Sequence, residues 1–241
     1  MIMELSQLLA TPKPLATNTY APISHEEIHD TIMSEIKDNA FKLKDISVKS
    51  KTGRNCIVMY SLIDEIASYQ DPEIGIRVGF KNSYDKTMSF GFALGSEVFI
   101  CGNGMVSGEY TIKKQHRMRD VNIFAKELIH QYFGQVRAEH DENLIFAKEL
   151  KQREVTEADA QRIIGELFIN NRIITQAQLR NMSSQMYNSD KFNSFKNVDT
   201  ISAWDLYNHG TEALKTSANI NLFNRHVEYN DYFRRNFGIS R

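Results

Sequence analysis

Cysteine and proline are scarce in this chain of 241 residues, which contains two cysteines and four prolines. Two thiols cannot make the disulfide framework of a small secreted protein, so we expect Cys56 and Cys101 to be reduced. No apolar run approaches the ~18 residues that are needed to cross a membrane. Residues 1–10 also lack the basic start and long apolar centre of a signal peptide. These absences predict a cytoplasmic protein without a membrane partner.

A large excess of charge of either sign is also absent, because the formal net charge is −1. Charged residues make up 24% of the chain and hydrophobic residues 41%, which is typical of a folded globular protein. The charge is unevenly distributed: residues 1–39 contain two basic and six acidic side chains, whereas residues 40–120 contain 12 and nine. The mildly basic middle indicates a weak nucleic-acid surface, not a strongly basic DNA-binding domain.

The order of the hydrophobic patterns predicts an α+β fold that begins with a helix. Three of the four prolines lie in residues 1–23, which we interpret as an extended N-terminal arm. Ser24 and Glu27 form a capping box, and isoleucine then recurs at every fourth position from 28 to 36. This spacing predicts a helix with one apolar face, starting directly after Ser24.

Alternating hydrophobic residues in the middle of the chain predict an antiparallel sheet of four to five strands. Gly53 suits the turn of a first hairpin. The segment Gly102-Asn103-Gly104 is expected to form a tight turn after the last strand. The predicted strands cover residues 41–48, 56–63, 74–80, 90–94 and 98–101.

Helical spacing returns at Val121 and predicts a long helix that packs on the sheet and continues to about residue 150. Further helix starts at Thr156 and Thr175 indicate a helical C-terminal part. The sequence therefore predicts three parts, which are an extended arm over residues 1–23, an α+β core over 24–152 and a helical C-terminal region over 153–241.

The segment His25-Glu26-Glu27-Ile28-His29 matches the H-E-x-x-H pattern of zinc hydrolases. On a helix its two histidines share a face and can hold zinc, with the glutamate as general base. The motif begins in the first helical turn, however, where acidic residues are favoured by the helix dipole, and no third ligand has a recognisable spacing. We interpret it as an ordinary helix start and keep a zinc hydrolase using His25 and His29 as a second alternative.

Basic side chains interleaved with aromatic ones mark three further segments. Residues 113–119 contain four fixed positive charges, and the two predicted hairpin turns contain more. Such a pattern suits single-stranded nucleic acid, because cations contact the phosphates and bases stack on rings for ~1–3 kcal/mol each. A solvated charged surface would show the same pattern. The predicted nucleic-acid-binding residues are Lys51, Arg54, Lys81, Tyr84, Lys86, Tyr110, Lys113, Lys114, Arg117 and Arg119.

Three segments together resemble a family of phages and plasmids that is known as domain-of-unknown-function family 932. They are Phe80-Lys81-Asn82-Ser83-Tyr84-Asp85, Phe99-Ile100-Cys101-Gly102-Asn103-Gly104-Met105 and Trp204-Asp205-Leu206-Tyr207-Asn208, in that order. The resemblance runs from about Ser24 to about Arg225. The chain departs from the family pattern at Gln115-His116-Arg117, where a basic-His-Thr motif is usual.

The family itself implies no established activity, but its order of elements is similar to that of single-strand annealing recombination proteins. The resemblance thus implies a phage or plasmid protein in the bacterial cytoplasm that binds and anneals single-stranded DNA as a homo-oligomer. No cofactor and no enzymatic reaction are expected of it. The alternative is a module that binds a host protein to counter host defences, which the near-zero net charge and the aromatic C-terminal tail favour.

Overall fold

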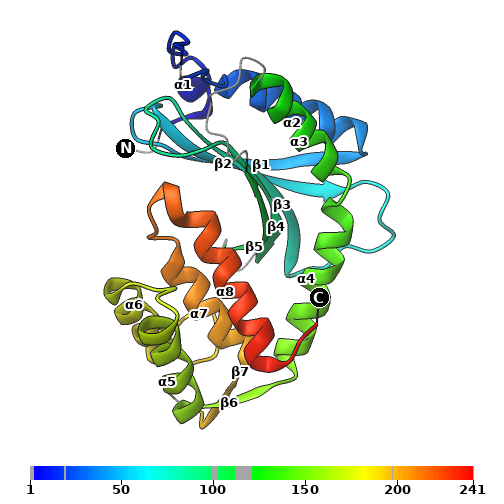
Figure 1. Cartoon of the computed structure of the whole chain (residues 1–241). Helices are drawn as coiled ribbons and strands as arrows, with labels where there is room; N and C mark the ends of the chain where they lie inside the picture. The colour runs from blue at the N-terminus through cyan, green and yellow to red at the C-terminus, as the bar shows by residue number, and fades with distance from the viewer. Residues whose placement is uncertain (1–2, 19, 99–102, 112–120, 197, 241) are drawn as a thin grey trace.

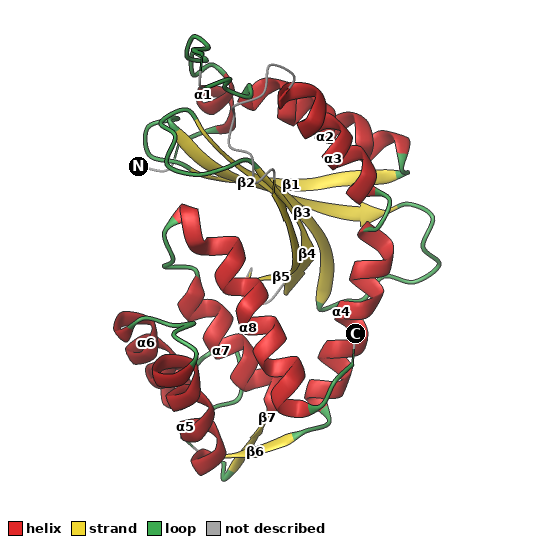
Figure 2. Ribbon diagram, in the orientation of Figure 1, coloured by secondary structure: helices red, strands yellow, loops and turns green. Residues whose placement is uncertain are grey.

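A five-stranded antiparallel sheet forms the centre of the molecule, with helices on both of its faces (Figures 1 and 2). The computed structural model describes residues 3–18, 20–98, 103–111, 121–196 and 198–240. The strands are joined in sequence order and are β1 (Phe41–Lys49), β2 (Asn55–Asp64), β3 (Ile74–Ser83), β4 (Gly91–Val98) and β5 (Asn103–Thr111). This arrangement confirms the predicted α+β class and the antiparallel sheet.

The last strand lies further along the chain than the sequence predicted. Val98 ends β4 and pairs with Asn103, the first residue of β5. Gly104, which was expected in a closing turn, therefore lies inside a strand, opposite Glu97. Strand β5 contains two glycines and few bulky apolar residues, so its sequence has little of the alternation that indicates a strand.

The first helical layer covers one face of the sheet. Ser24 caps α2, because its Oγ accepts a hydrogen bond from the backbone nitrogen of Glu27 at 3.4 Å. The isoleucines of α2 are buried against the sheet as predicted. Leu8 of the N-terminal arm is also fully buried in this core, so the arm contributes to the fold. The helices of this layer are α1 (Leu5–Leu9), α2 (His25–Asp38) and α3 (Val121–Phe133).

The second helical layer is formed by the C-terminal region and covers the other face of the sheet. Trp204 stacks on Tyr207 with ring centroids 5.6 Å apart, and Tyr229 and Phe233 pack on the same tyrosine. The aromatic tail, for which the sequence left open docking on the domain or on a partner, therefore packs within the domain. Helix α4 (Val136–Lys151) instead follows α3 on the first face, where His140 and Asn143 bond to Ser96, and its later residues reach the core of the C-terminal region. The elements of the second layer are β6 (Glu154–Thr156), α5 (Glu157–Gly165), the π-helical turn η1 (Glu166–Asn170), α6 (Gln176–Asn188), β7 (Thr200–Ser202), α7 (Ala203–Leu214), the 3-10 turn η2 (Asn219–Asn221) and α8 (Leu222–Phe237).

The predicted long helix after residue 120 is instead two consecutive helices, α3 and α4. The helix ends at Phe133, and the chain turns through Gly134 and Gln135 before α4 begins. Glycine in a helix interior costs about 1 kcal/mol relative to alanine, so Gly134 is a natural place for the break. The break lets α3 pack in the first layer, while α4 contacts β3, β4 and α7.

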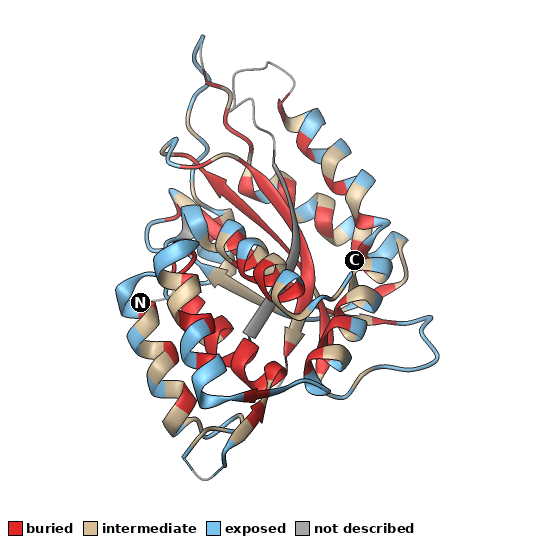
Figure 3. Cartoon of the chain, turned by 60° about the horizontal axis from the view of Figure 1, so that its bottom comes forward, coloured by how far each residue is buried: buried red, intermediate tan, exposed pale blue. Residues whose placement is uncertain are grey.

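Strands β3 and β4 are buried along almost their whole length, on both faces (Figure 3). A sheet with one face in water would instead alternate between buried and exposed residues. On the second face, Ile57 and Ala93 contact Phe223 at the start of α8. The sheet therefore needs both helical layers.

The contact between the sheet and α8 also contains a polar cluster, which consists of Lys49, Arg77, Glu97 and His226. Nitrogen and oxygen atoms of Arg77 and Glu97 lie 3.4 Å apart, and both side chains are largely buried. Lys49 donates to the backbone carbonyl of Ser217 at 2.7 Å. Burial, together with the nearby charges of Lys49 and Arg77, lowers the pKa of His226 to about 4.

Strand β1 forms one edge of the sheet and is irregular there. Leu43 pairs with Leu62 and Asp45 with Ser61, so Lys44 is the extra residue of a β-bulge. Lys44 is exposed on this edge strand. Bulges and lysines are features that keep an edge strand from pairing with another chain.

Among the described residues, no helix combines the length and the apolar character that a membrane crossing requires.

Gly210 provides a test of the packing between α7 and α8. A Cβ atom at this position would clash with the hydroxyl and ring of the fully buried Tyr229. We expect Gly210→Ala to lower the free energy of unfolding by about 1–3 kcal/mol, although alanine favours a helix. Chemical denaturation measures the change, with Gly165→Ala as control, because a Cβ there meets nothing within 4 Å. Equal stability of the two variants would contradict this packing.

Candidate nucleic-acid interface

The turn between β1 and β2 presents two basic side chains to solvent. Gly53 adopts a φ of +73°, a conformation that L side chains rarely adopt. Ser50 holds the turn, because its Oγ accepts from the nitrogen of Gly53 at 3.0 Å and donates to the carbonyl of Asn55 at 2.7 Å. Lys51 and Arg54, two of the predicted contact residues, are exposed on this framework.

The turn between β3 and β4 is joined directly to the first turn. The side-chain nitrogen of Asn55 donates to Asp85 at 2.9 Å, and the backbone nitrogen of Tyr84 donates to the carbonyl of Arg54 at 2.5 Å. Lys86 is exposed in this second turn, and its ammonium lies 4.7 Å from the centre of the Tyr20 ring. Lys51, Arg54 and Lys86 thus occupy one end of the sheet, which we call the basic end.

The chain enters the strongest basic segment from the same end of the sheet. Thr111, the last residue of β5, pairs with Gly91, which directly follows the β3–β4 turn. The predicted residues of this segment, Lys113, Lys114, Arg117 and Arg119, lie outside the described residues. The backbone of Tyr110 pairs with Phe92 in the sheet, but its side chain is not in the described part of the structure.

Two predicted contact residues, Lys81 and Tyr84, have buried side chains. Lys81 is 4% exposed, and its ammonium lies 5.9 Å from the centre of the Phe223 ring. The Tyr84 ring stacks on His25 with centroids 3.9 Å apart, and its hydroxyl accepts a hydrogen bond from the His25 backbone nitrogen. Neither side chain presents a free face at the basic end, so neither is part of the interface proposed below.

Acidic side chains near the basic end reduce its charge without removing it. Burial works against ionisation of Asp85, but hydrogen bonds from Thr87 and Asn55 outweigh it and hold its carboxyl pKa below the ordinary value. Glu27 lies 3.9 Å from Lys13 in an exposed ion pair. The segment of residues 113–119 contains no carboxylate.

Phe124 is an exposed aromatic residue of α3 that was not among the predicted contact residues. It is 41% exposed in the first turn of this helix, five positions after Arg119. Val121 and Ala125 face the core instead. Helical spacing alone did not distinguish these positions, because four apolar residues fall within the first five of α3. Phe124 therefore offers the open ring face that Tyr84 lacks.

His25 of the H-E-x-x-H segment is buried in a hydrogen-bonded network below the basic end. Its Nε2 lies 2.9 Å from the carbonyl of Gly53, which can only accept, so Nε2 carries the proton. Its Nδ1 accepts from the side-chain nitrogen of Asn82 at 3.1 Å and lies 3.5 Å from the sulfur of Cys56. Burial raises the pKa of the Cys56 thiol, which makes it a poor nucleophile.

This network does not provide a zinc site. Both ring nitrogens of His25 are bound within the protein, and Nδ1 of His29 lies 2.9 Å from the hydroxyl of Tyr60. Within the described ranges, no group of three or more histidine, cysteine, aspartate or glutamate side chains is arranged to hold a metal ion. His25 instead joins the start of α2 to the first hairpin turn and to β3.

The burial of His25 predicts a loss of stability in acid. Burial lowers its folded-state pKa to about 4, below the ordinary 6.5, although the bond to Gly53 opposes this shift. Between pH 4 and 6.5 the unfolded chain therefore binds more protons than the folded protein. The free energy of unfolding falls by up to about 3 kcal/mol as the pH drops from 6.5 towards 4. Chemical denaturation across this range should show a weaker pH dependence for His25→Gln than for the wild type. If the wild type and His25→Gln lose stability equally over this pH range, the assignment of the low pKa to His25 is wrong.

Comparisons with known proteins agree with the motifs spread along the chain. Residues 15–236 match the model of DUF932, which is described as a domain of unknown function. No curated protein and no solved structure matched the chain. The matched region includes all five strands of the sheet and most of α8. The chain therefore belongs to the DUF932 family.

Proposed function

We propose that this protein binds single-stranded nucleic acid at the basic end of the sheet and promotes strand annealing without bond chemistry. One observation carries the proposal: two exposed basic turns are hydrogen-bonded to each other, and β5 leads from the same end into a segment with four positive charges. A phage or plasmid recombination protein that acts as a homo-oligomer on single-stranded DNA fits this arrangement.

The chemistry of the basic end suits a flexible single strand. Lys51, Arg54 and Lys86 are exposed on turns that are held by hydrogen bonds, so the backbone positions from which these side chains project are defined. Phosphate contacts of this kind supply affinity without sequence preference. Aromatic rings beside them add stacking with any base. Phe124, which is 41% exposed and follows Arg119 by five positions, is our candidate for this stacking.

Replacement of the basic turn residues tests the phosphate contacts. We expect the triple variant Lys51→Ala, Arg54→Ala, Lys86→Ala to bind a labelled single strand more than about tenfold more weakly in fluorescence anisotropy. The slope of log affinity against log salt should fall by about 2, since each lost single-strand phosphate contact removes ~0.7.

The control for this experiment is a triple variant with the same loss of charge elsewhere. Lys148, Arg180 and Lys196 are exposed and lie outside the basic end, so their replacement by alanine should leave affinity within about twofold. A second arm replaces Lys113, Lys114, Arg117 and Arg119. Unchanged affinity in both basic variants would refute the proposed interface.

Phe124 tests the stacking component separately. We expect Phe124→Ala to weaken single-strand binding by about 1–3 kcal/mol and Phe124→Tyr to preserve it, because stacking requires the ring. Duplex binding should change little, since paired bases are not free to stack on it. Equal single-strand affinity of Phe124→Ala and the wild type would show that the ring does not contact a base.

A further inference from the structure

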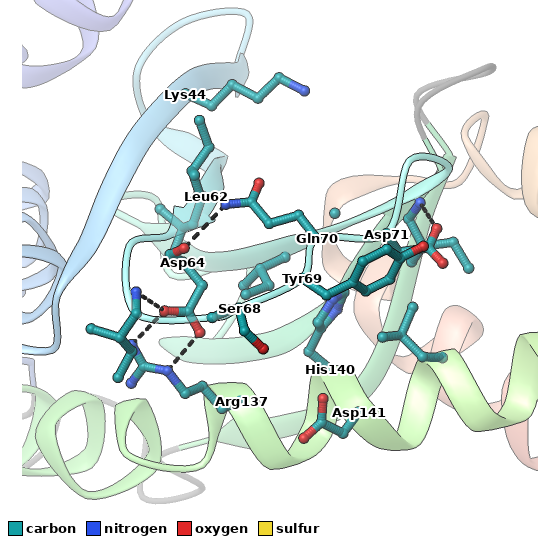
Figure 4. A pocket seen from close by; sticks show the side chains of 17 residues that line it. Lys44, Leu62, Asp64, Ser68, Tyr69, Gln70, Asp71, Arg137, His140 and Asp141 are labelled. Atoms are coloured by element: carbon teal, nitrogen blue, oxygen red, sulfur yellow. Dashed lines mark hydrogen bonds and ion pairs between the residues drawn. The ribbon is translucent and has the colours of Figure 1, made fainter.

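A pocket of about 640 Å³ lies at the end of the sheet opposite the basic end (Figure 4). It is enclosed by the end of β2, the start of β3, the loop that joins them and α4. The volume lies within the range of about 300–1,000 Å³ that is usual for small-ligand sites. We call it the β2–β3 pocket.

The loop that covers this pocket is fixed at both ends. The backbone nitrogen of Ile66 donates to the carboxylate of Asp64 at 3.1 Å, and the side chain of Gln70 donates to the Asp64 carbonyl at 3.1 Å. Asp71 accepts from the backbone nitrogens of Glu73 and Ile74. The loop is therefore preorganised, with its tip held over the pocket.

Two apolar side chains at this tip face solvent. Ile66 is 68% exposed and Tyr69 is 70% exposed, although both line the pocket. Figure 4 shows the Tyr69 ring between Gln70 and Asp71, over His140. A tyrosine at the mouth of a pocket can cover an apolar stem or a cation with its ring.

Charge in the pocket favours a cation. Asp64 is neutralised by Arg137, with nitrogen–oxygen distances of 2.6 and 2.8 Å. The remaining fixed charges are Asp71, Asp141 and Lys44, so negative charge exceeds positive charge. Figure 4 places Lys44 on β1, across the pocket from Asp141 on α4.

His140 adds a polar group that is neutral near pH 7. Burial lowers its pKa, against the opposing influence of Asp141, Asp71 and Asp64. Its Nδ1 lies 3.0 Å from Oγ of Ser96, which fixes the ring in the wall of the pocket.

We propose that the β2–β3 pocket binds a small organic cation, an ammonium or guanidinium group on a short apolar stem. The charged group lies between Asp141 and Asp71, beside His140. The stem lies on the apolar floor, which includes Ile74 and Leu144. This chemistry is shared by free amines and by the lysine and arginine side chains of a protein partner. The proposal does not depend on nucleic-acid binding.

Isothermal titration calorimetry at low salt tests the proposal with defined probes. Agmatine represents a free amine, N-acetyl-arginine amide represents a side chain of a protein, and N-acetyl-glutamine amide and butanol are neutral controls. We expect at least one cationic probe to bind with a Kd below about 10 mM and both neutral compounds to bind at least about tenfold more weakly. Tighter binding of agmatine indicates a free amine, and tighter binding of the arginine amide indicates a protein side chain.

Asp141→Asn is the decisive variant, because Asp141 is exposed and its replacement keeps the shape of the side chain. We expect it to weaken cation binding about tenfold, and Tyr69→Ala to weaken it as well. Asp30→Asn, an exposed change of the same kind on α2, is the control and should leave the Kd unchanged. Absence of binding by every cationic probe, or equal binding by wild type and Asp141→Asn with the same thermal midpoint, would overturn the proposal.

Discussion

The burial of both sheet faces is the constraint on which the rest of this structure depends. Strands β3 and β4 are buried on both faces, with large apolar side chains on one face and small or charged ones, such as Ala93, Arg77 and Glu97, on the other, so water is excluded from both. Helices α2 and α3 meet one face, and the C-terminal helices meet the other. The second face of the sheet is therefore buried only when the C-terminal region has folded onto it. Its aromatic residues, for which the sequence left open docking on the domain or on a partner, pack in the core of the C-terminal region.

Covering the second face also buries charge. Arg77 and Glu97 lie on the neighbouring strands β3 and β4, and His226 of α8 is held neutral beside them. Because both partners of this ion pair belong to the sheet, the pair does not depend on the position of α8. Lys49 is the group that joins the sheet to the covering layer, since it donates to the backbone carbonyls of Lys215 and Ser217 after α7. Displacement of this segment would take both acceptors away from the ammonium group.

Much of the fold was predictable from the sequence, because most elements carry their own local signal. The capped helix after Ser24, the hairpin at Gly53 and the strands β1 to β3 follow from spacing and turn chemistry alone. The glycine-rich strand β5 was misplaced, since its position is determined by pairing with β4 and not by its own side chains. The break at Gly134 was missed because apolar spacing continues across it.

The candidate site was less predictable, for a related physical reason. Sequence identifies a charged or aromatic side chain but does not say which layer will cover it. Lys81 and Tyr84 look like neighbours of Lys86 in the sequence, yet Lys81 lies under Phe223 and Tyr84 lies against His25. Both contacts join residues more than 50 positions apart, which no local pattern records.

The β-bulge at Lys44 bears on how copies of this protein can assemble. A strand of a second copy cannot continue the sheet past β1 without meeting an irregular backbone and an exposed lysine. Copies that assemble through β1 therefore have to contact each other through side chains, and the sheet of each copy ends at its own β1. A sheet continued across β1 would instead join two copies by backbone hydrogen bonds along the whole strand.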